Sequence, residues 1–215
     1  MGKVVAIDGP AGSGKGTVAK LVAEKCNLLY IDTGAMYRAI AYLSLKNNID
    51  ITEEDKIVSL ALNSKIEFID GKTYLNGEDI SKEIRTMEVT KIVSPISSIV
   101  KLREILVDLQ REMAKDYDVI MEGRDITTVV FPNANYKFYL DASVEERANR
   151  RYKENVEKGI SSSYEEILDN IIKRDYNDMH KEVGSLTRTS DSIYIDSTNM
   201  TIDEVVNKII SIIEV

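Results

Sequence analysis

Short apolar runs alternate with helical patterns along the 215 residues of this chain. Runs that predict buried strands lie at residues 4–7, 28–31, 118–121, 136–140 and 193–195. Between them, apolar residues recur at helical spacing, most clearly over 35–46, 99–113, 167–172 and 202–213. This alternation predicts an α/β fold, a five-stranded parallel sheet with helices on both faces.

One stretch, residues 65–80, interrupts the alternation. Its short apolar runs are each followed by a turn dipeptide, Asp70-Gly71 and then Asn76-Gly77, and these dipeptides are the strongest short-range signals for a β-hairpin. We therefore expect a small insert of antiparallel strands. The insert is either a decorated loop or part of a flap that covers a substrate.

Three positions have the composition of a helix start. Thr52 precedes an apolar pattern and is predicted to cap a helix there. Ser143 with Glu146, and Thr201 with Glu204, have the spacing of a capping box. Helices are accordingly expected to begin directly after each of these residues.

Composition narrows the classes of function. The net charge of −8 argues against nucleic acid as the main partner, because no extended basic surface is available. Cys26 is the only cysteine, so no internal disulfide can form. With no signal peptide and no apolar run of membrane-spanning length, the sequence predicts a cytoplasmic protein without a membrane partner. The single histidine, His180, is expected at the surface and excludes a His-rich metal site.

The strongest chemical signal follows the first predicted strand. It is the run Gly9-Pro10-Ala11-Gly12-Ser13-Gly14-Lys15-Gly16-Thr17. A glycine-rich turn between a strand and a helix lets backbone N–H groups converge on a phosphate, and the helix start adds a partial positive charge. Lys15 supplies a full charge and Thr17 a hydroxyl for magnesium. We predict that this loop binds the phosphates of a nucleoside triphosphate, with Mg²⁺ as its metal.

The match to the P-loop pattern G-x-x-x-x-G-K-[ST] is offset at one place. Gly16 occupies the position of the expected serine or threonine, and Thr17 follows one residue later. The form Lys-Gly-Thr resembles the P-loop of nucleoside monophosphate kinases. The alternative, a turn that only joins a strand to a helix, does not explain so many small residues around one lysine.

Further segments occur in an order that resembles the bacterial cytidylate kinases (CMP kinases). Together with the P-loop they span almost the whole chain: Asp32-Thr33-Gly34-Ala35-Met36-Tyr37-Arg38, Glu83-Ile84-Arg85-Thr86, Gly123-Arg124-Asp125-Ile126-Thr127-Thr128-Val129-Val130-Phe131-Pro132, Phe138-Tyr139-Leu140-Asp141-Ala142-Ser143 and Glu145-Glu146-Arg147-Ala148. The insert at 65–85 is also similar to one in that family. The resemblance implies ATP-dependent phosphorylation of CMP and dCMP.

The resemblance also implies roles for individual residues. Thr33 and Arg38 match positions that hold the monophosphate, and the arginine fork suits a phosphate dianion. Arg103 and Arg124 match two further phosphate contacts. The remaining matches concern the nucleoside, with Ser94 at a cytosine contact, Asp125 at a nucleoside contact and Asp178 at a sugar contact.

Residues 178–181 depart from the family. Asp178 is followed by Met179 and His180, and Lys181 stands where the family usually has an arginine. A lysine keeps the charge but loses the two-pronged fork, so one contact to sugar or phosphate is predicted to be weaker.

Arginines at helical spacing are predicted to close over the transferring group. Arg147, Arg150 and Arg151 lie at i, i+3 and i+4, and with Arg174 they resemble lid arginines. Lys15, Arg147, Arg151 and Arg174 are thus the candidate catalytic residues. Alternatively, the helix face is paired with Glu145, Glu146 and Glu154. Two simpler roles also stay open: Asp125 pairs only with Arg124, and Asp32 is a strand-end cap rather than a catalytic carboxylate.

The predicted organisation is one kinase unit with three parts. These are a core (1–32, 86–142 and 176–215), a monophosphate-binding region with the β insert (33–85) and a lid (143–175). Rival interpretations are another small-molecule kinase, a GTP-binding switch or a non-catalytic nucleotide-binding protein. The sequence lacks the Asn-Lys-x-Asp guanine motif of a switch. We expect a monomer whose partners are ATP, CMP and dCMP.

Overall fold

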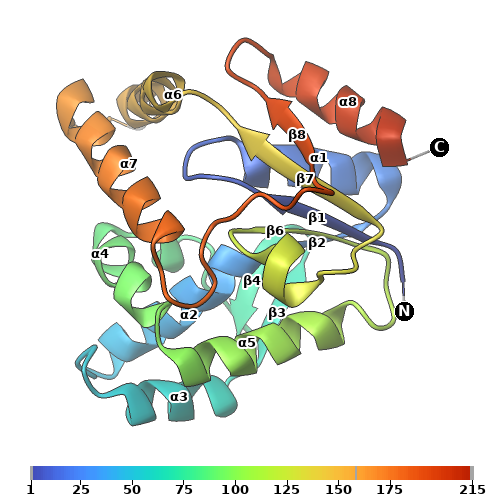
Figure 1. Ribbon diagram of the computed structural model, residues 1–215. Coiled ribbons are helices and arrows are strands. Elements are labelled where there is room, and N and C mark those ends of the chain that lie inside the picture. Colours follow the sequence, from blue (N-terminus) through green and yellow to red (C-terminus); the bar gives the residue numbers. More distant parts are fainter. Residues whose placement is uncertain (1, 158, 214–215) are drawn as a thin grey trace. The chain divides into compact units, whose positions relative to one another are not determined.

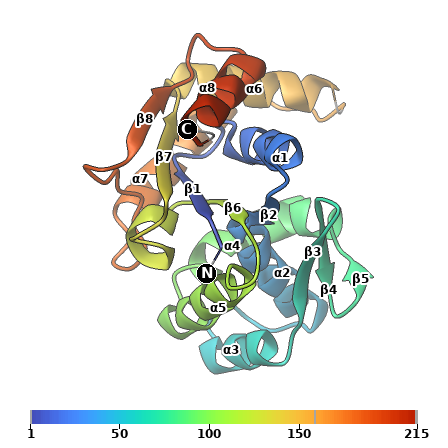
Figure 2. The ribbon, with the colours of Figure 1, turned by 90° about the vertical axis from the view of Figure 1, so that its right-hand side faces the viewer.

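The computed structural model describes residues 2–157 and 159–213. The chain divides into two compact units. One consists mainly of Tyr30–Tyr117, and the other combines Lys3–Leu29 with the described residues from Asp118 onward. The two are called the insert unit and the loop unit here. Figures 1 and 2 show the elements within each.

The loop unit is built on parallel strands. These are β1 (Val4–Asp8), β6 (Val119–Gly123), β7 (Tyr136–Asp141) and β8 (Ile193–Asp196). β1 pairs with β6 and with β7, and β7 pairs with β8, all in parallel. The sheet has five strands in the order β2-β6-β1-β7-β8, and β2 (Leu29–Asp32) crosses the boundary of the unit at its first residue. All five residues of β1 are buried, as expected of a central strand in a parallel sheet.

Helices cover this sheet. α1 (Lys15–Cys26) and α8 (Ile202–Ile213) pack together on one face, and η2 (Ile126–Val130), a short π-helical segment, lies against the other (Figure 2). α6 (Val144–Glu157) and α7 (Tyr164–Met179) form a helical pair. Ala148, Ile167 and Ile171 are the buried core of that pair.

The insert unit has its own apolar core. Its helices are α2 (Thr33–Lys46), α3 (Glu54–Leu62), the short 3₁₀ segment η1 (Glu83–Arg85), α4 (Met87–Ile96) and α5 (Val100–Met113). β3 (Ile66–Ile69), β4 (Lys72–Leu75) and β5 (Glu78–Asp79) form a small antiparallel sheet. Fully buried side chains from α2, α3 and α5, among them Ile40, Ile57 and Leu102, meet in one cluster.

The predicted fold class is confirmed, since the sheet has five parallel strands with helices packed against it. The antiparallel insert is confirmed as well, with turns at Asp70-Gly71 and Asn76-Gly77. Both capping boxes begin helices: Ser143 Oγ accepts from the Glu146 N–H at 3.2 Å, and Thr201 Oγ1 accepts from the Glu204 N–H at 3.3 Å.

One prediction about local structure is wrong. Thr52 does not cap α3, because its hydroxyl donates to Asp50 Oδ1 at 2.7 Å and the helix begins only at Glu54. Arg103 is one of the buried residues of α5. Its residue is only 5% exposed, and its guanidinium donates to the Ser97 carbonyl at 2.9 Å.

Candidate active site

The phosphate-binding candidate is the loop between β1 and α1. It leaves β1 at Asp8, and α1 begins at Lys15, directly after Gly14. The loop starts against the end of β7, where a methyl group on Gly9 would lie 2.0 Å from the Leu140 carbonyl oxygen. Only glycine fits at such a close approach of two backbones. The fold thus places a strand, a tight glycine turn and a helix N-terminus in the order that phosphate binding needs.

Lys15 is held inside this loop. It is 5% exposed, and its ammonium group donates to the Pro10 carbonyl at 2.8 Å and to Ser13 Oγ at 3.5 Å. Burial, with the nearby charges of Arg124 and Arg174, lowers the pKa of Lys15 to about 7. An incoming polyphosphate would supply the negative charge that this environment lacks.

Thr17 lies in the first turn of α1, and its side chain is exposed. Within residues 2–157 and 159–213, no group of three or more His, Cys, Asp or Glu side chains could hold a metal ion. Magnesium commonly takes few protein ligands and is held mainly by substrate phosphates and water. A single accessible hydroxyl beside the loop fits that mode of binding.

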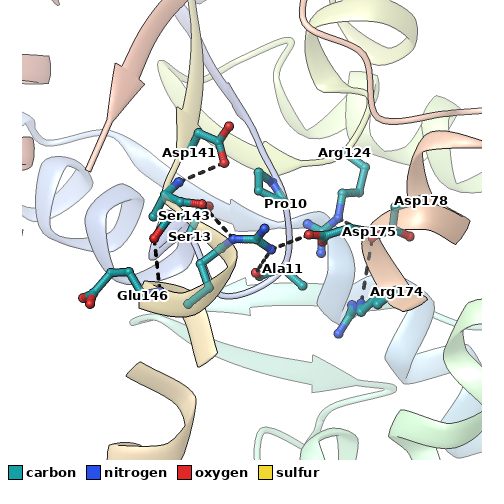
Figure 3. Close-up of polar contacts among 12 residues, drawn as sticks. Pro10, Ala11, Ser13, Arg124, Asp141, Ser143, Glu146, Arg174, Asp175 and Asp178 are labelled. Carbon is teal, nitrogen blue, oxygen red and sulfur yellow. Dashed lines mark hydrogen bonds and ion pairs between the residues drawn. The ribbon is translucent and has the colours of Figure 1, made fainter. Parts of the chain in front are cut away.

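Arg124, at the end of β6, belongs to a charged cluster around Asp178 on α7. Arg124 Nε donates to Asp178 Oδ2 at 2.8 Å. Arg174 Nε and Lys181 Nζ lie 3.9 Å and 3.5 Å from the same carboxylate. Burial alone would raise the pKa of Asp178, but Arg124 and the other cations lower it. Three predicted site residues, Arg124, Asp178 and Lys181, thus meet at one place together with Arg174. Figure 3 shows Arg124, Asp178 and Arg174 of this cluster.

Asp125 is buried beside Arg124, at the start of η2. Arg124 contacts the carboxylate of Asp178. The conformation after Asp125 is fixed by Asp8, whose two carboxylate oxygens accept the Ile126 N–H at 2.9 Å and the Thr127 N–H at 2.7 Å. Asp8 also accepts the Thr127 hydroxyl at 2.7 Å. One buried carboxylate therefore connects the end of β1 to the segment that carries Arg124 and Asp125.

The three arginines of α6 have different surroundings. Arg147 is buried and pairs with Asp175 of α7 at 2.6 Å. Arg150 is half-buried and pairs with Glu146 at 2.9 Å. Arg151 is exposed and pairs with Glu154 at 3.0 Å. A helix face paired with glutamates therefore describes Arg150 and Arg151 but not Arg147.

The insert unit holds the other predicted acceptor residues. Thr33 is the buried first residue of α2, and Arg38, one turn later, donates to the Ile84 carbonyl and to Thr90 Oγ1 at 3.1 and 3.0 Å. Arg103 lies over the ring of Tyr37, 5.5 Å from its centroid. Ser94 is in α4, where its carbonyl accepts the Ser97 hydroxyl at 2.8 Å. Their roles toward a nucleotide stay predictions.

Asp32 is a helix cap. Its Oδ1 accepts the Ala35 N–H at 2.9 Å at the start of α2, and its Oδ2 pairs with Arg85 at 3.0 Å. Capping accounts for Oδ1, and the ion pair with Arg85 accounts for Oδ2.

Two buried aspartates were missed by sequence reasoning. Asp8 anchors η2, and Asp175 pairs with Arg147. Burial raises the pKa of both carboxyl groups. The only sequence signal for Asp8 was a charged residue at the end of a buried strand, directly before the loop.

Comparison with known proteins identifies the family of this chain. The family model for cytidylate kinase matches residues 5–215. The chain belongs to the cytidylate kinase family. It is 48% identical over 208 residues to a cytidylate kinase of Clostridioides difficile (strain 630), which covers 97% of this chain and 96% of that protein. It is 52% identical over 210 residues to one from Clostridium perfringens (strain SM101 / Type A), covering 98% and 97%.

Solved structures support the fold. The chain superposes on a shikimate kinase from Bacteroides thetaiotaomicron with a TM-score of 0.51 at 13% sequence identity, over 99% of each chain. At that identity the likeness shows a shared fold only. As a member of the cytidylate kinase family, the chain is a nucleoside monophosphate kinase. Among the described residues, no helix is both long and apolar enough to cross a membrane.

Proposed function

We propose that this enzyme transfers the γ-phosphoryl group of ATP to CMP and to dCMP, giving CDP and dCDP. The observation that carries the proposal is the buried Lys15 inside a glycine loop at a helix N-terminus, in a chain of the cytidylate kinase family. The arrangement suits a polyphosphate, because the N–H groups, the helix start and the lysine all favour negative charge.

Phosphoryl transfer requires positioning and charge neutralisation more than covalent chemistry. In the loop unit, the residues 9–17 would bind the donor phosphates, with Lys15 as the point charge. Arg124 lies at the end of a strand beside β1, at the edge of the sheet where ligands bind in α/β folds. Asp178 keeps its guanidinium in place. Arg174 and the exposed Arg151 are proposed to neutralise the transferring group.

The acceptor contacts are proposed from the family pattern. Arg38 and Arg103 would hold the monophosphate together with Thr33, while Ser94 and Asp125 would contact the nucleoside. Asp178 and Lys181 would contact the sugar. Lys181 already lies 3.5 Å from Asp178, so the lysine can occupy the position of the usual arginine near that carboxylate.

Magnesium is proposed as the metal, with Thr17 as its protein ligand. When bound, the ion would neutralise charge on the donor phosphates. The chain's own groups supply the remaining positive charge. We further propose a cytoplasmic monomer without a nucleic-acid partner, since free nucleotides are its substrates. Light scattering of the purified protein tests the oligomeric state.

A coupled assay of ADP formation tests the reaction. ATP and magnesium are fixed, and the acceptor is varied among CMP, dCMP, UMP, AMP, GMP and dTMP. We expect strong turnover with CMP and dCMP and weak turnover with the others. A preference for AMP or dTMP would contradict the acceptor roles of Ser94, Arg103, Asp125 and Asp178. A parallel assay with EDTA is expected to abolish turnover.

A further inference from the structure

The carbonyl groups of the phosphate loop are bound by cationic side chains. A loop whose N–H groups point toward a phosphate must direct its carbonyl groups elsewhere, and each buried carbonyl needs a donor. Lys15 donates to the Pro10 carbonyl at 2.8 Å. Arg147 donates to the Ala11 carbonyl at 3.0 Å, and Arg150 lies 3.4 Å from that of Ser13. Three cations thus fix the orientation of three peptide groups in one short loop.

Arg147 contacts protein groups through two of its nitrogens, Nη1 and Nε. Its Nη1 reaches both the Ala11 carbonyl and Asp175 Oδ2, and its Nε donates to the Ala142 carbonyl at 2.9 Å. It is only 3% exposed. A methyl group at Gly12 would lie 3.3 Å from the Arg147 Cβ, so the loop also packs directly against this side chain. Figure 3 shows Ala11 and Asp175 approaching the same guanidinium from the loop and from α7.

Arg151 on the same helix provides the contrast. Its side chain is 53% exposed, and it pairs with Glu154, a neighbour on α6. The printed contacts of Arg147 instead go to the loop, to α7 and to the Ala142 carbonyl. The two arginines therefore differ in their partners: Arg151 pairs within its own helix, and Arg147 holds the loop.

We propose that Arg147 is a positioning residue, not a phosphate contact: with Asp175 it holds the Ala11 peptide so that the loop is preorganised for polyphosphate. This inference rests on the proposed use of the loop for ATP. The ion pair joins α6 to α7, and the hydrogen bond from Arg147 to the Ala11 carbonyl connects this helical pair to the loop. Binding energy for ATP therefore depends on a contact behind the loop.

Direct binding of MgATP and of inorganic tripolyphosphate, measured by calorimetry without CMP, tests the proposal. For Arg147→Met we expect both dissociation constants to rise by the same factor, roughly 10–100-fold, because small displacements of positioning groups have effects of that order. The KM for ATP should rise in parallel, while the dissociation constant for CMP should stay within about twofold. Arg147→Lys should give dissociation constants between those of the wild type and of Arg147→Met. A lysine can reach either the Ala11 carbonyl or the Asp175 carboxylate, but it lacks the arginine fork that reaches both.

The matched control is Lys153→Met, an exposed cation on the same helix, which should change neither ligand's affinity. Asp175→Asn keeps an acceptor for Arg147 and removes the charge, so it should weaken ATP binding less than Arg147→Met does. If Arg147→Met fails to fold, Arg147→Lys and Asp175→Asn provide the same readout.

Several outcomes would overturn the proposal. Folded variants that lower kcat but bind ATP like the wild type would make Arg147 a transition-state contact. A lower melting temperature with unchanged ATP affinity would make its role merely structural. Weaker ATP binding with unchanged tripolyphosphate binding would show that Arg147 affects contacts to the nucleoside of ATP and not to its phosphates. Failure of the proposed function looks different, since the wild type would then bind ATP without turning over CMP.

Discussion

The phosphate loop and the β3–β4–β5 insert both depend on glycine turns, but they are held in different ways. The insert is held by its own strands: Ile66 pairs with Leu75, Phe68 with Thr73, and the Lys65 N–H donates to Asn76 Oδ1 at 2.8 Å. The loop is held largely by side chains from distant elements. Arg147 and Arg150 come from α6, more than 130 residues away along the chain.

The difference teaches where function is sensitive to substitution. A locally held turn tolerates change, since its backbone pairs survive the loss of one side chain. When a loop is held by cationic side chains from distant elements, substitution of one of those side chains changes the conformation of the loop and therefore its affinity for the ligand. This comparison can be tested by substitution and titration, from the largest expected effect to the smallest.

Lys15→Met should have the largest effect on activity. Removing a preorganised charge aimed at the reacting group typically lowers kcat by about 10²–10³-fold. The fold should persist, because methionine fills a similar volume at a buried position. Steady-state kinetics and circular dichroism measure both properties, with the exposed Lys20→Met on the same helix as the control. Near-normal turnover would remove Lys15 from the catalytic assignment.

Asp8→Asn should lower stability and weaken the acceptor site. Asp8 accepts three hydrogen bonds from Ile126 and Thr127 with its two carboxylate oxygens. An asparagine has a single amide oxygen to accept them. A buried donor without its acceptor costs about 1–3 kcal/mol. Urea unfolding measures the loss. The KM for CMP should rise more than the KM for ATP, because η2 follows Arg124 and Asp125 directly. An equal rise in both would disconnect Asp8 from the acceptor segment.

ATP binding should take up a proton near pH 8. Burial lowers the pKa of Lys15 to about 7, so the amine is mostly neutral at that pH in the free enzyme. Phosphate charge raises this pKa again, and the bound lysine is protonated. Calorimetry in buffers of different ionisation enthalpy measures the uptake, and Lys15→Met should abolish it. Proton release on binding would contradict the assignment.

The same pKa has a consequence for stability. The unfolded lysine keeps its ordinary pKa of 10.5, so between about pH 7 and 10.5 the unfolded state binds more protons than the folded state. The contribution of Lys15 to the free energy of unfolding therefore rises with pH across this window. Lys15→Met should remove that slope in urea unfolding curves.

Gly77→Ala in the insert should have the smallest effect. Gly77 has φ = +84°, and an added methyl group would have no atom within 4 Å, so the cost is backbone strain without a clash. We expect a loss of about 1 kcal/mol in the free energy of unfolding and unchanged kinetics. A marked loss of CMP turnover would instead favour the interpretation of the insert as a flap over the substrate.

The local parts of this molecule could be predicted from the sequence. The loop and the insert are marked by glycine dipeptides and apolar runs, and both were found in the expected places. α4 was not predicted, because its β-branched residues Val89, Thr90 and Val93 and the internal Pro95 are not typical of a helix.

Long-range contacts could not be predicted in the same way. η2 depends on Asp8, which lies 118 residues earlier. The i, i+3, i+4 spacing of the α6 arginines indicated one shared face but not which side chain is buried. That was decided by the packing of α6 on α7 through Ala148 and Ile167.

α7 runs without interruption from Tyr164 to Met179, past the predicted lid boundary at residue 175. Asp175 pairs with Arg147, and Asp178 pairs with Arg124. The two aspartates therefore lie less than one turn apart on the same uninterrupted helix. Because both carboxylates belong to one helix, a displacement of α7 would change the geometry of both ion pairs at the same time. We expect a ligand that displaces α7 to alter both ion pairs, and the resulting coupling between donor and acceptor binding to be reciprocal, with each ligand changing the affinity for the other by the same factor.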